Sequence, residues 1–142
     1  MIATVTQMIA THPKPGRDLG RNRLEDCIAA CMECSQACTT CADACLSEKI
    51  VEDLVRCVRL DLDCADMCAT TGRMLSRLTA FDHAVARAML EACAVACRAC
   101  GDECLAHADM HEHCRVCAEA CRRCERACHE LLRAMATPAD GT

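Results

Sequence analysis

The sequence has 142 residues, a net charge of −5 and a single aromatic residue, Phe81. These values exclude a nucleic-acid-binding protein, because such a protein needs a basic surface and aromatic side chains on which bases stack. No stretch approaches the about 18 apolar residues of a membrane span, and the N-terminus lacks the pattern of an export signal. We therefore expect a cytoplasmic protein that contacts no membrane.

Gly and Pro residues divide the chain into a short arm, one domain and a tail. Between these breaks Ala, Leu, Glu and Arg dominate and β-branched residues are few, which predicts an all-α fold. Residues 1–12 are expected to form a short helix that Pro13 and Pro15 end. We interpret residues 1–18 as an arm, either an appendage or a contact with another copy of the chain, and residues 136–142 as a tail.

The first two long helices are predicted from their candidate N-caps. Asp18 precedes a helix expected over residues 19–46, and Ser47 precedes a second helix expected over residues 48–78. No Gly or Pro marks the break between them. It is indicated instead by the step from Cys45 to Cys57, which rotates the cysteine stripe around the helix axis by about a third of a turn.

Two patterns similar to capping boxes predict the starts of the remaining helices. Thr79 is followed three residues later by Asp82, and Asp109 is followed by Glu112 at the same spacing. The fourth helix is then expected to reach Met135.

Four helices of similar length with short connections predict an antiparallel up-down-up-down four-helix bundle over residues 19–135. The third connection leaves an alternative open, because residues 102–136 contain no Gly or Pro and fit one continuous helix. The step from Cys104 to Cys114 rotates the stripe by about 80° and favours a turn. Without that turn, long helical hairpins would pair as a dimer.

Cysteine residues dominate the predicted core. Their alternating gaps of three and four residues keep side chains on one helical face. Cysteine has a lower helix propensity than leucine and buries less area, so this repetition indicates selection for something other than packing. All 18 cysteines lie on four stripes: Cys27, Cys31, Cys34, Cys38, Cys41 and Cys45; Cys57, Cys64 and Cys68; Cys93, Cys97, Cys100 and Cys104; and Cys114, Cys117, Cys121, Cys124 and Cys128.

The antiparallel arrangement also predicts which cysteines face one another. A fold-back at residue 47 pairs Cys57 with Cys38, Cys64 with Cys31, and Cys68 with Cys27. A fold-back at residue 109 pairs Cys104 with Cys114, and Cys93 with Cys124 and Cys128.

Metal binding explains this pattern better than disulfide formation does. Thiols stay reduced in the cytoplasm, and bridging cysteines four apart on a helix would strain a disulfide. Cu(I) is soft and accepts low coordination numbers, so pairs of thiolates at helical spacing suit it, with an upper capacity of about 18 ions if thiolates bridge. The alternatives that remain are zinc or cadmium storage, since C-x2-C pairs recur, and a thiol–disulfide redox protein. We expect no enzymatic activity.

Two further groups of candidate ligands lie near the stripes. His107, His111 and His113 gather with Met110 at the turn before the fourth helix, where they form either a mouth for copper ions or an ordinary solvated loop. Asp61 falls on the seam of the second helix and is a candidate oxygen ligand or proton acceptor, unless the helix is rotated so that Leu60 faces inward instead.

The repeated C-x3-C spacing resembles that of the cytosolic bacterial copper storage proteins. The resemblance covers residues 19–135 and is carried by these pairs: Cys27/Cys31, Cys34/Cys38, Cys41/Cys45, Cys64/Cys68, Cys93/Cys97, Cys100/Cys104, Cys117/Cys121 and Cys124/Cys128. It implies a four-helix bundle that fills with many Cu(I) ions, assembles into homotetramers and lacks an export signal. It also implies that the stripe cysteines are ligands and that the histidines stand where secreted relatives place methionines. Copper donor or acceptor proteins are the expected partners.

Overall fold

The computed structural model describes residues 2–14 and 20–136, and these ranges are helical without a strand. The elements are α1 (Ile2–Ala10), α2 (Arg21–Leu46), the 3-10 helix η2 (Val51–Leu54), α3 (Val55–Leu75), α4 (His83–Ala106) and α5 (Glu112–Ala136). The predicted all-α fold is confirmed.

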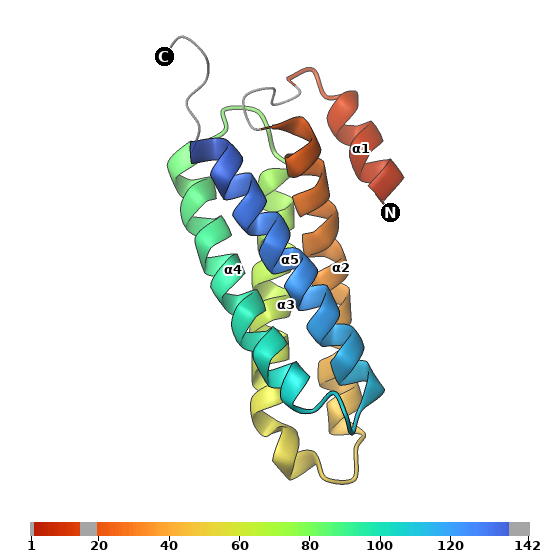
Figure 1. Cartoon of the computed structure of the whole chain (residues 1–142). Coiled ribbons are helices and arrows are strands. Elements are labelled where there is room, and N and C mark those ends of the chain that lie inside the picture. The colour runs from red at the N-terminus through yellow and green to blue at the C-terminus, as the bar shows by residue number, and fades with distance from the viewer. Residues whose placement is uncertain (1, 15–19, 137–142) are drawn as a thin grey trace.

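The four long helices form an elongated antiparallel bundle (Figure 1). Each packs against two neighbours, so that α2 contacts α3 and α5, while α4 contacts α3 and α5. The short helix α1 lies outside the bundle beside α2 and buries Ile9. The third connection is a turn and not a continuous helix, as the phase of the cysteine stripe predicted.

The connection between α2 and α3 differs from the prediction. Ser47 is the C-cap of α2, and its backbone N–H donates to the carbonyl group of Ala44, while the N–H of Glu48 donates to that of Cys45. Its φ of −94° and ψ of −2° are helical, whereas an N-cap needs an extended backbone. The predicted helix over residues 48–78 was therefore wrong at both ends, because α3 spans only Val55–Leu75.

The start of α2 also differs from the prediction. Gly20 precedes the first helical residue, Arg21, and has a φ of 69°, in the left-handed region that glycine tolerates. Asp18, the expected N-cap, lies outside the described residues.

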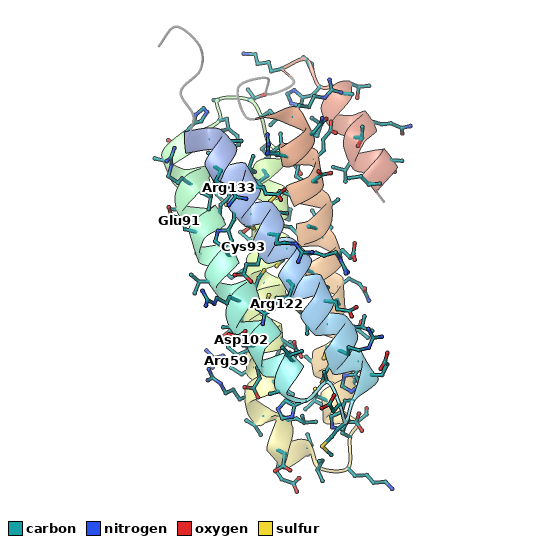
Figure 2. The ribbon with its side chains drawn as sticks, in the orientation of Figure 1. Arg59, Glu91, Cys93, Asp102, Arg122 and Arg133 are labelled. Atoms are coloured by element: carbon teal, nitrogen blue, oxygen red, sulfur yellow. The ribbon has the colours of Figure 1, made fainter. Side chains whose placement is uncertain are left out.

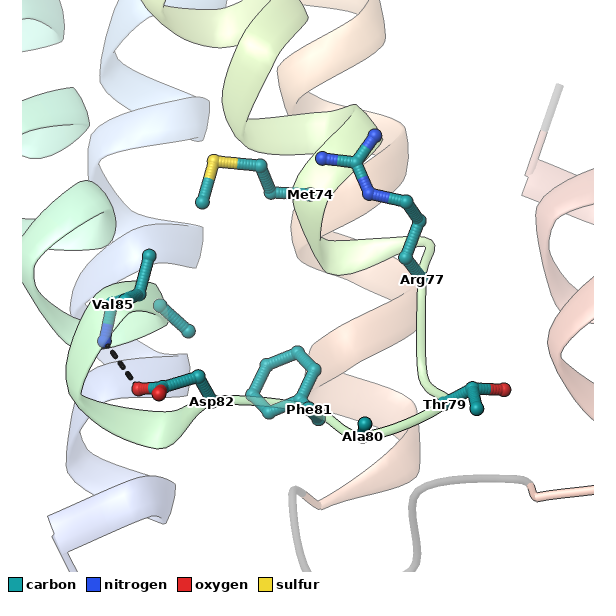
Figure 3. Close-up of a pocket in the computed structure, with 8 residues that line it drawn as sticks. Met74, Arg77, Thr79, Ala80, Phe81, Asp82 and Val85 are labelled. Carbon is teal, nitrogen blue, oxygen red and sulfur yellow. Dashed lines mark hydrogen bonds between the residues drawn. The ribbon is translucent and has the colours of Figure 1, made fainter.

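The N-cap of α4 is Asp82 and not Thr79. The carboxylate of Asp82 accepts a hydrogen bond from the backbone N–H of Val85 at 3.0 Å (Figure 3). A capping box needs Glu or Gln as its second member to reach back to the first, and Asp is too short for this role. The second pattern also placed the helix start too early. Asp109 lies in a turn formed by residues 107–110, and α5 begins three residues later, at Glu112.

Charged side chains surround the bundle and pair across its outer surface (Figure 2). Arg122 of α5 forms an ion pair with Asp102 of α4, and Arg123 of α5 pairs with Glu33 of α2. Gly101 permits the close approach at the first pair, since a Cβ there would lie 3.2 Å from the Arg122 guanidinium. No described helix is long and apolar enough to cross a membrane.

One leucine from each long helix closes the end of the bundle that holds the start of α2. Leu24, Leu75, Leu90 and Leu131 are at most 1% exposed. Leu24 and Leu90 precede the first cysteine of their helices by three residues, whereas Leu131 follows the last cysteine of its helix by three and Leu75 by seven. The opposite end carries the turn between α4 and α5 with its histidines, so the two ends of the core differ in chemistry.

Candidate metal centre

The cysteine stripes meet along the axis of the bundle, and their sulfur atoms form a continuous row. All 18 cysteines are buried and reduced. Sulfur atoms from different helices approach closely, as in the pairs Cys68–Cys97 at 3.6 Å, Cys38–Cys121 at 3.7 Å and Cys31–Cys124 at 3.7 Å. These separations are much longer than a disulfide bond of about 2.05 Å.

Several groups of four sulfur atoms are compact enough to surround one metal ion. Within each group, every pair of ligand atoms lies within 4.8 Å. Neighbouring groups share members, so that one sulfur belongs to two candidate sites. The groups include Cys31, Cys93, Cys124 and Cys128; Cys34, Cys68, Cys97 and Cys124; Cys34, Cys38, Cys64 and Cys121; Cys38, Cys100, Cys117 and Cys121; and Cys41, Cys45, Cys57 and Cys114.

The predicted pairing between the first two stripes was wrong in register. Cys57 groups with Cys41 and Cys45 instead of Cys38, and the Cys64 sulfur lies 3.9 Å from Cys34 instead of facing Cys31. Cys68 likewise groups with Cys34, which lies seven residues after the predicted partner Cys27. The error follows from the position of the connection, which is centred near residue 50 because η2 precedes α3.

The pairing predicted between the cysteines of α4 and α5 is confirmed for Cys93. Cys93 of α4 lies with Cys124 and Cys128 of α5 in one candidate site. Here the predicted fold-back at residue 109 coincides with the observed turn.

Asp61 is enclosed by the thiols, and the alternative in which Leu60 replaces it is wrong. Asp61 is 0% exposed, whereas Leu60 is only partly buried. Its Oδ1 atom accepts hydrogen bonds from three thiols, those of Cys100 at 3.0 Å, Cys104 at 3.3 Å and Cys117 at 3.3 Å. Burial raises the pKa of the Asp61 carboxyl to about 7, and the charge of Cys117 acts in the same direction.

His113 joins the thiol row at the end opposite the leucines. Its Nδ1 atom lies 3.3 Å from the Cys41 sulfur and 3.7 Å from the Cys114 sulfur. Its Nε2 atom lies 2.8 Å from the Glu48 carboxylate. The imidazole therefore has one nitrogen at the thiols and one at an anchoring carboxylate.

His111 stacks on His113, with ring centroids 5.6 Å apart and an angle of 20° between the rings. Its Nδ1 atom contacts the same Glu48 carboxylate at 3.0 Å. Its Nε2 atom is buried and has no hydrogen-bond partner among the described residues.

The remaining two candidates lie farther out. The Nε2 atom of His107 lies 3.0 Å from a carboxylate oxygen of Glu103. Among the described residues, its imidazole has no hydrogen bond to a thiol. Met110 is 70% exposed. The structure thus brings His113, with His111 stacked on it, to one end of the thiol row and leaves Met110 exposed on the surface.

Two residues, one near each end of the thiol row, were missed by sequence reasoning. Glu48 was hidden by the misplaced helix boundary at Ser47. Thr71 follows Cys68 by three residues on the same face of α3, so continuing the alternating spacing past the last cysteine would have found it. The Thr71 hydroxyl is buried without a hydrogen-bond partner among the described residues.

The thiols at the histidine end of the row are held in the protonated form. Burial raises the pKa of the Cys114 thiol to about 12, and burial also raises the pKa of Cys45. Binding a metal ion here must displace protons, because the thiolate is the form that coordinates metals.

The fold and the sulfur row define a helical bundle that holds soft metal ions in shared thiolate sites. The chain belongs to the copper storage protein family, whose profile matches residues 20–133.

Solved structures of bacterial relatives agree with this assignment. The copper storage protein Ccsp from Streptomyces lividans, loaded with 10 copper equivalents, is 56% identical over 92% of this chain and 98% of its own, with a TM-score of 0.90. A structure of a cytosolic copper storage protein from the same organism with five coppers is 61% identical over 83% and 97%, with a TM-score of 0.80. The metal-free copper storage protein 3 from Bacillus subtilis is 38% identical over 76% and 97%, with a TM-score of 0.64.

Proposed function

We propose that this protein stores Cu(I) as a cargo of many ions bound to thiolates along the axis of the bundle. The observation that carries the proposal is the row of buried, reduced sulfurs whose groups of four share members. The similarity to a relative loaded with 10 copper equivalents supports it. All 18 stripe cysteines are candidate ligands in this account.

Sharing of sulfurs favours copper over zinc. A zinc ion needs four ligands at about 2.3 Å, which places tetrahedral sulfurs about 3.8 Å apart, so an isolated group would also fit zinc. Bridging distinguishes the metals, because Cu(I) with two or three shared thiolates reaches a loading near one ion per sulfur. The positive charge of each ion then offsets one thiolate charge inside the low-dielectric core.

The histidine end is the proposed mouth of the store. His113 lies beside the outermost thiols, and His107, His111 and Met110 supply further imidazole and thioether groups, which are copper ligands, at the same end. The leucine layer closes the other end. Asp61, deeper in the row, is proposed as an oxygen ligand or as an acceptor for protons that the thiols release.

A storage role implies no catalytic residues, and the burial of the thiols supports this: every cysteine is at most 1% exposed, including Cys27, whose pKa is lowered to about 5 by hydrogen bonding with Cys128. A redox or nucleophilic cysteine needs a lowered pKa and access to solvent. Cys41, the thiol beside His113, is 1% exposed, and its hydrogen bonding with Cys104 raises its pKa.

Location and assembly are proposed from the relatives. A cytoplasmic location is supported by the Streptomyces lividans relative that is described as cytosolic. A homotetramer is proposed by family resemblance, and exposed apolar side chains such as Leu62, Val95 and Val116 offer surface for contacts between copies. Copper donor and acceptor proteins are proposed as transient partners.

Anaerobic titration of the reduced protein tests the storage proposal. Cu(I) is added against a competing chelator while free copper and free thiols are measured, and Zn(II) is titrated in parallel. Uptake continuing toward about one Cu(I) per thiol supports storage in bridged sites. Saturation at a few Cu(I) ions, or tighter binding of one Zn(II) per four thiols, contradicts it.

A further inference from the structure

Glu48 holds two histidines with a single carboxylate oxygen. It lies just after α2, and its Oε2 atom is 2.8 Å from Nε2 of His113 and 3.0 Å from Nδ1 of His111. The two contacts therefore involve different ring nitrogens. This asymmetry has a chemical consequence for each imidazole.

An ionised carboxylate only accepts hydrogen bonds, so each nitrogen that contacts it must carry a proton. A glutamate carboxyl is ordinarily ionised at neutral pH, and Glu48 is partly exposed to solvent. In a neutral imidazole the second nitrogen then has a free lone pair. That nitrogen is Nδ1 in His113, at 3.3 Å from the Cys41 sulfur, and the partnerless Nε2 in His111.

We propose that Glu48 is a positioning residue that fixes His111 and His113 in opposite tautomers, so that each presents an unprotonated nitrogen to an incoming Cu(I) ion. The copper part of this statement rests on the proposed storage function. The tautomer part does not, because it follows from the contacts of the two rings with the Glu48 carboxylate in the metal-free protein.

The contacts around the two rings leave the carboxylate as the group that selects the tautomer. A thiol beside His113 can donate to Nδ1 or accept from it, so Cys41 alone imposes no choice. His111 has no other hydrogen-bond partner among the described residues at its second nitrogen. Outer carboxylates that orient histidine ligands in this way raise metal affinity by about 10–100-fold.

The first readout is the tautomer state of the reduced, metal-free protein, measured by long-range ¹H–¹⁵N spectra of the imidazoles. We expect His113 protonated at Nε2 and His111 protonated at Nδ1. Glu48→Ala removes the acceptor and is expected to abolish both preferences, whereas Glu48→Gln keeps a neutral acceptor of the same size and restores them in part. Glu52→Ala is the matched control, since Glu52 is exposed in the same connection.

The second readout is competition with a Cu(I) chelator. Glu48→Ala is expected to weaken binding of the first ions about tenfold, with the total capacity and the helical circular dichroism unchanged. Glu52→Ala is expected to match the wild type. The reverse tautomers in the wild type, or tautomers and affinity unchanged in Glu48→Ala, would overturn the proposal. If the wild type took up no Cu(I), the storage function would fail, while the spectra would still decide the role of Glu48.

Discussion

At the scale of single residues, the core contains a carboxylate that three thiols contact. Asp61 is fully buried, and its Oδ1 atom accepts hydrogen bonds from thiols of α4 and α5. Transferring a charged carboxylate into such a site is unfavourable, which is why its pKa rises. In the metal-free protein the neutral acid is therefore favoured only below about pH 7.

Replacement of Asp61 by Asn is expected to change how stability depends on pH. The folded-state pKa of Asp61 is about 7, above the ordinary value of 3.8. Between these values the folded state holds more protons than the unfolded state, so stability falls as pH rises, by up to about 1.4 kcal/mol per pH unit. Asp61→Asn removes this contribution. Denaturation of the reduced, metal-free proteins at several pH values from 4 to 8 measures it, and parallel curves for the two proteins would refute the prediction.

Replacement of Thr71 by Val is expected to stabilise the metal-free protein by about 1 kcal/mol. The hydroxyl group is buried without a described hydrogen-bond partner, and Val has nearly the same shape without the polar atom. Thr39→Val is the matched control, because the exposed Thr39 hydroxyl donates to the Ser35 carbonyl group at 2.7 Å. Urea denaturation gives both changes, and a loss of stability in Thr71→Val would show that its hydroxyl has a partner in solution.

At the scale of helices, the cysteine spacing predicted the buried faces correctly, whereas the helix ends were less predictable. Burial imposes the three-and-four period on every turn of a helix, so the signal accumulates along the sequence. A helix end depends on one or two residues, and this chain offers more candidate caps than it uses. Ser47 and Thr79 both match N-cap preferences, but neither is an N-cap.

Replacement of the α4 N-cap tests this correction directly. Asp82→Ala removes the hydrogen bond to the Val85 N–H and is expected to lower the free energy of unfolding by about 1 kcal/mol. Thr79→Ala, at the residue that the sequence pattern favoured, is expected to change it by less than about 0.5 kcal/mol. Thermal or urea denaturation compares the two variants. The opposite ranking would return the N-cap to Thr79.

At the scale of the whole molecule, the antiparallel bundle turns four separate stripes into one row of sulfur. The sequence predicted the members of the row because each stripe is a local pattern. The pairing of α2 with α3 was not predictable, since it depends on a 3-10 turn that adds residues to the connection. The roles of His113 and Glu48 likewise depend on contacts over 65 residues of sequence.

The two ends of the row give the molecule a direction. Leu24, Leu75, Leu90 and Leu131 close one end, whereas imidazoles and a carboxylate surround the other. Ions that enter at the histidine end would pass Cys41 and Asp61 before they reach the sulfurs near the leucines.

Anomalous diffraction at the copper edge from crystals of the Cu(I)-loaded protein shows where the bound ions lie. We expect a row of copper peaks along the axis, each at bonding distance from buried sulfurs of at least two helices, from the group at Cys41 to the group at Cys128. Copper confined to surface histidines or methionines, with no peaks among the buried sulfurs, would contradict this expectation.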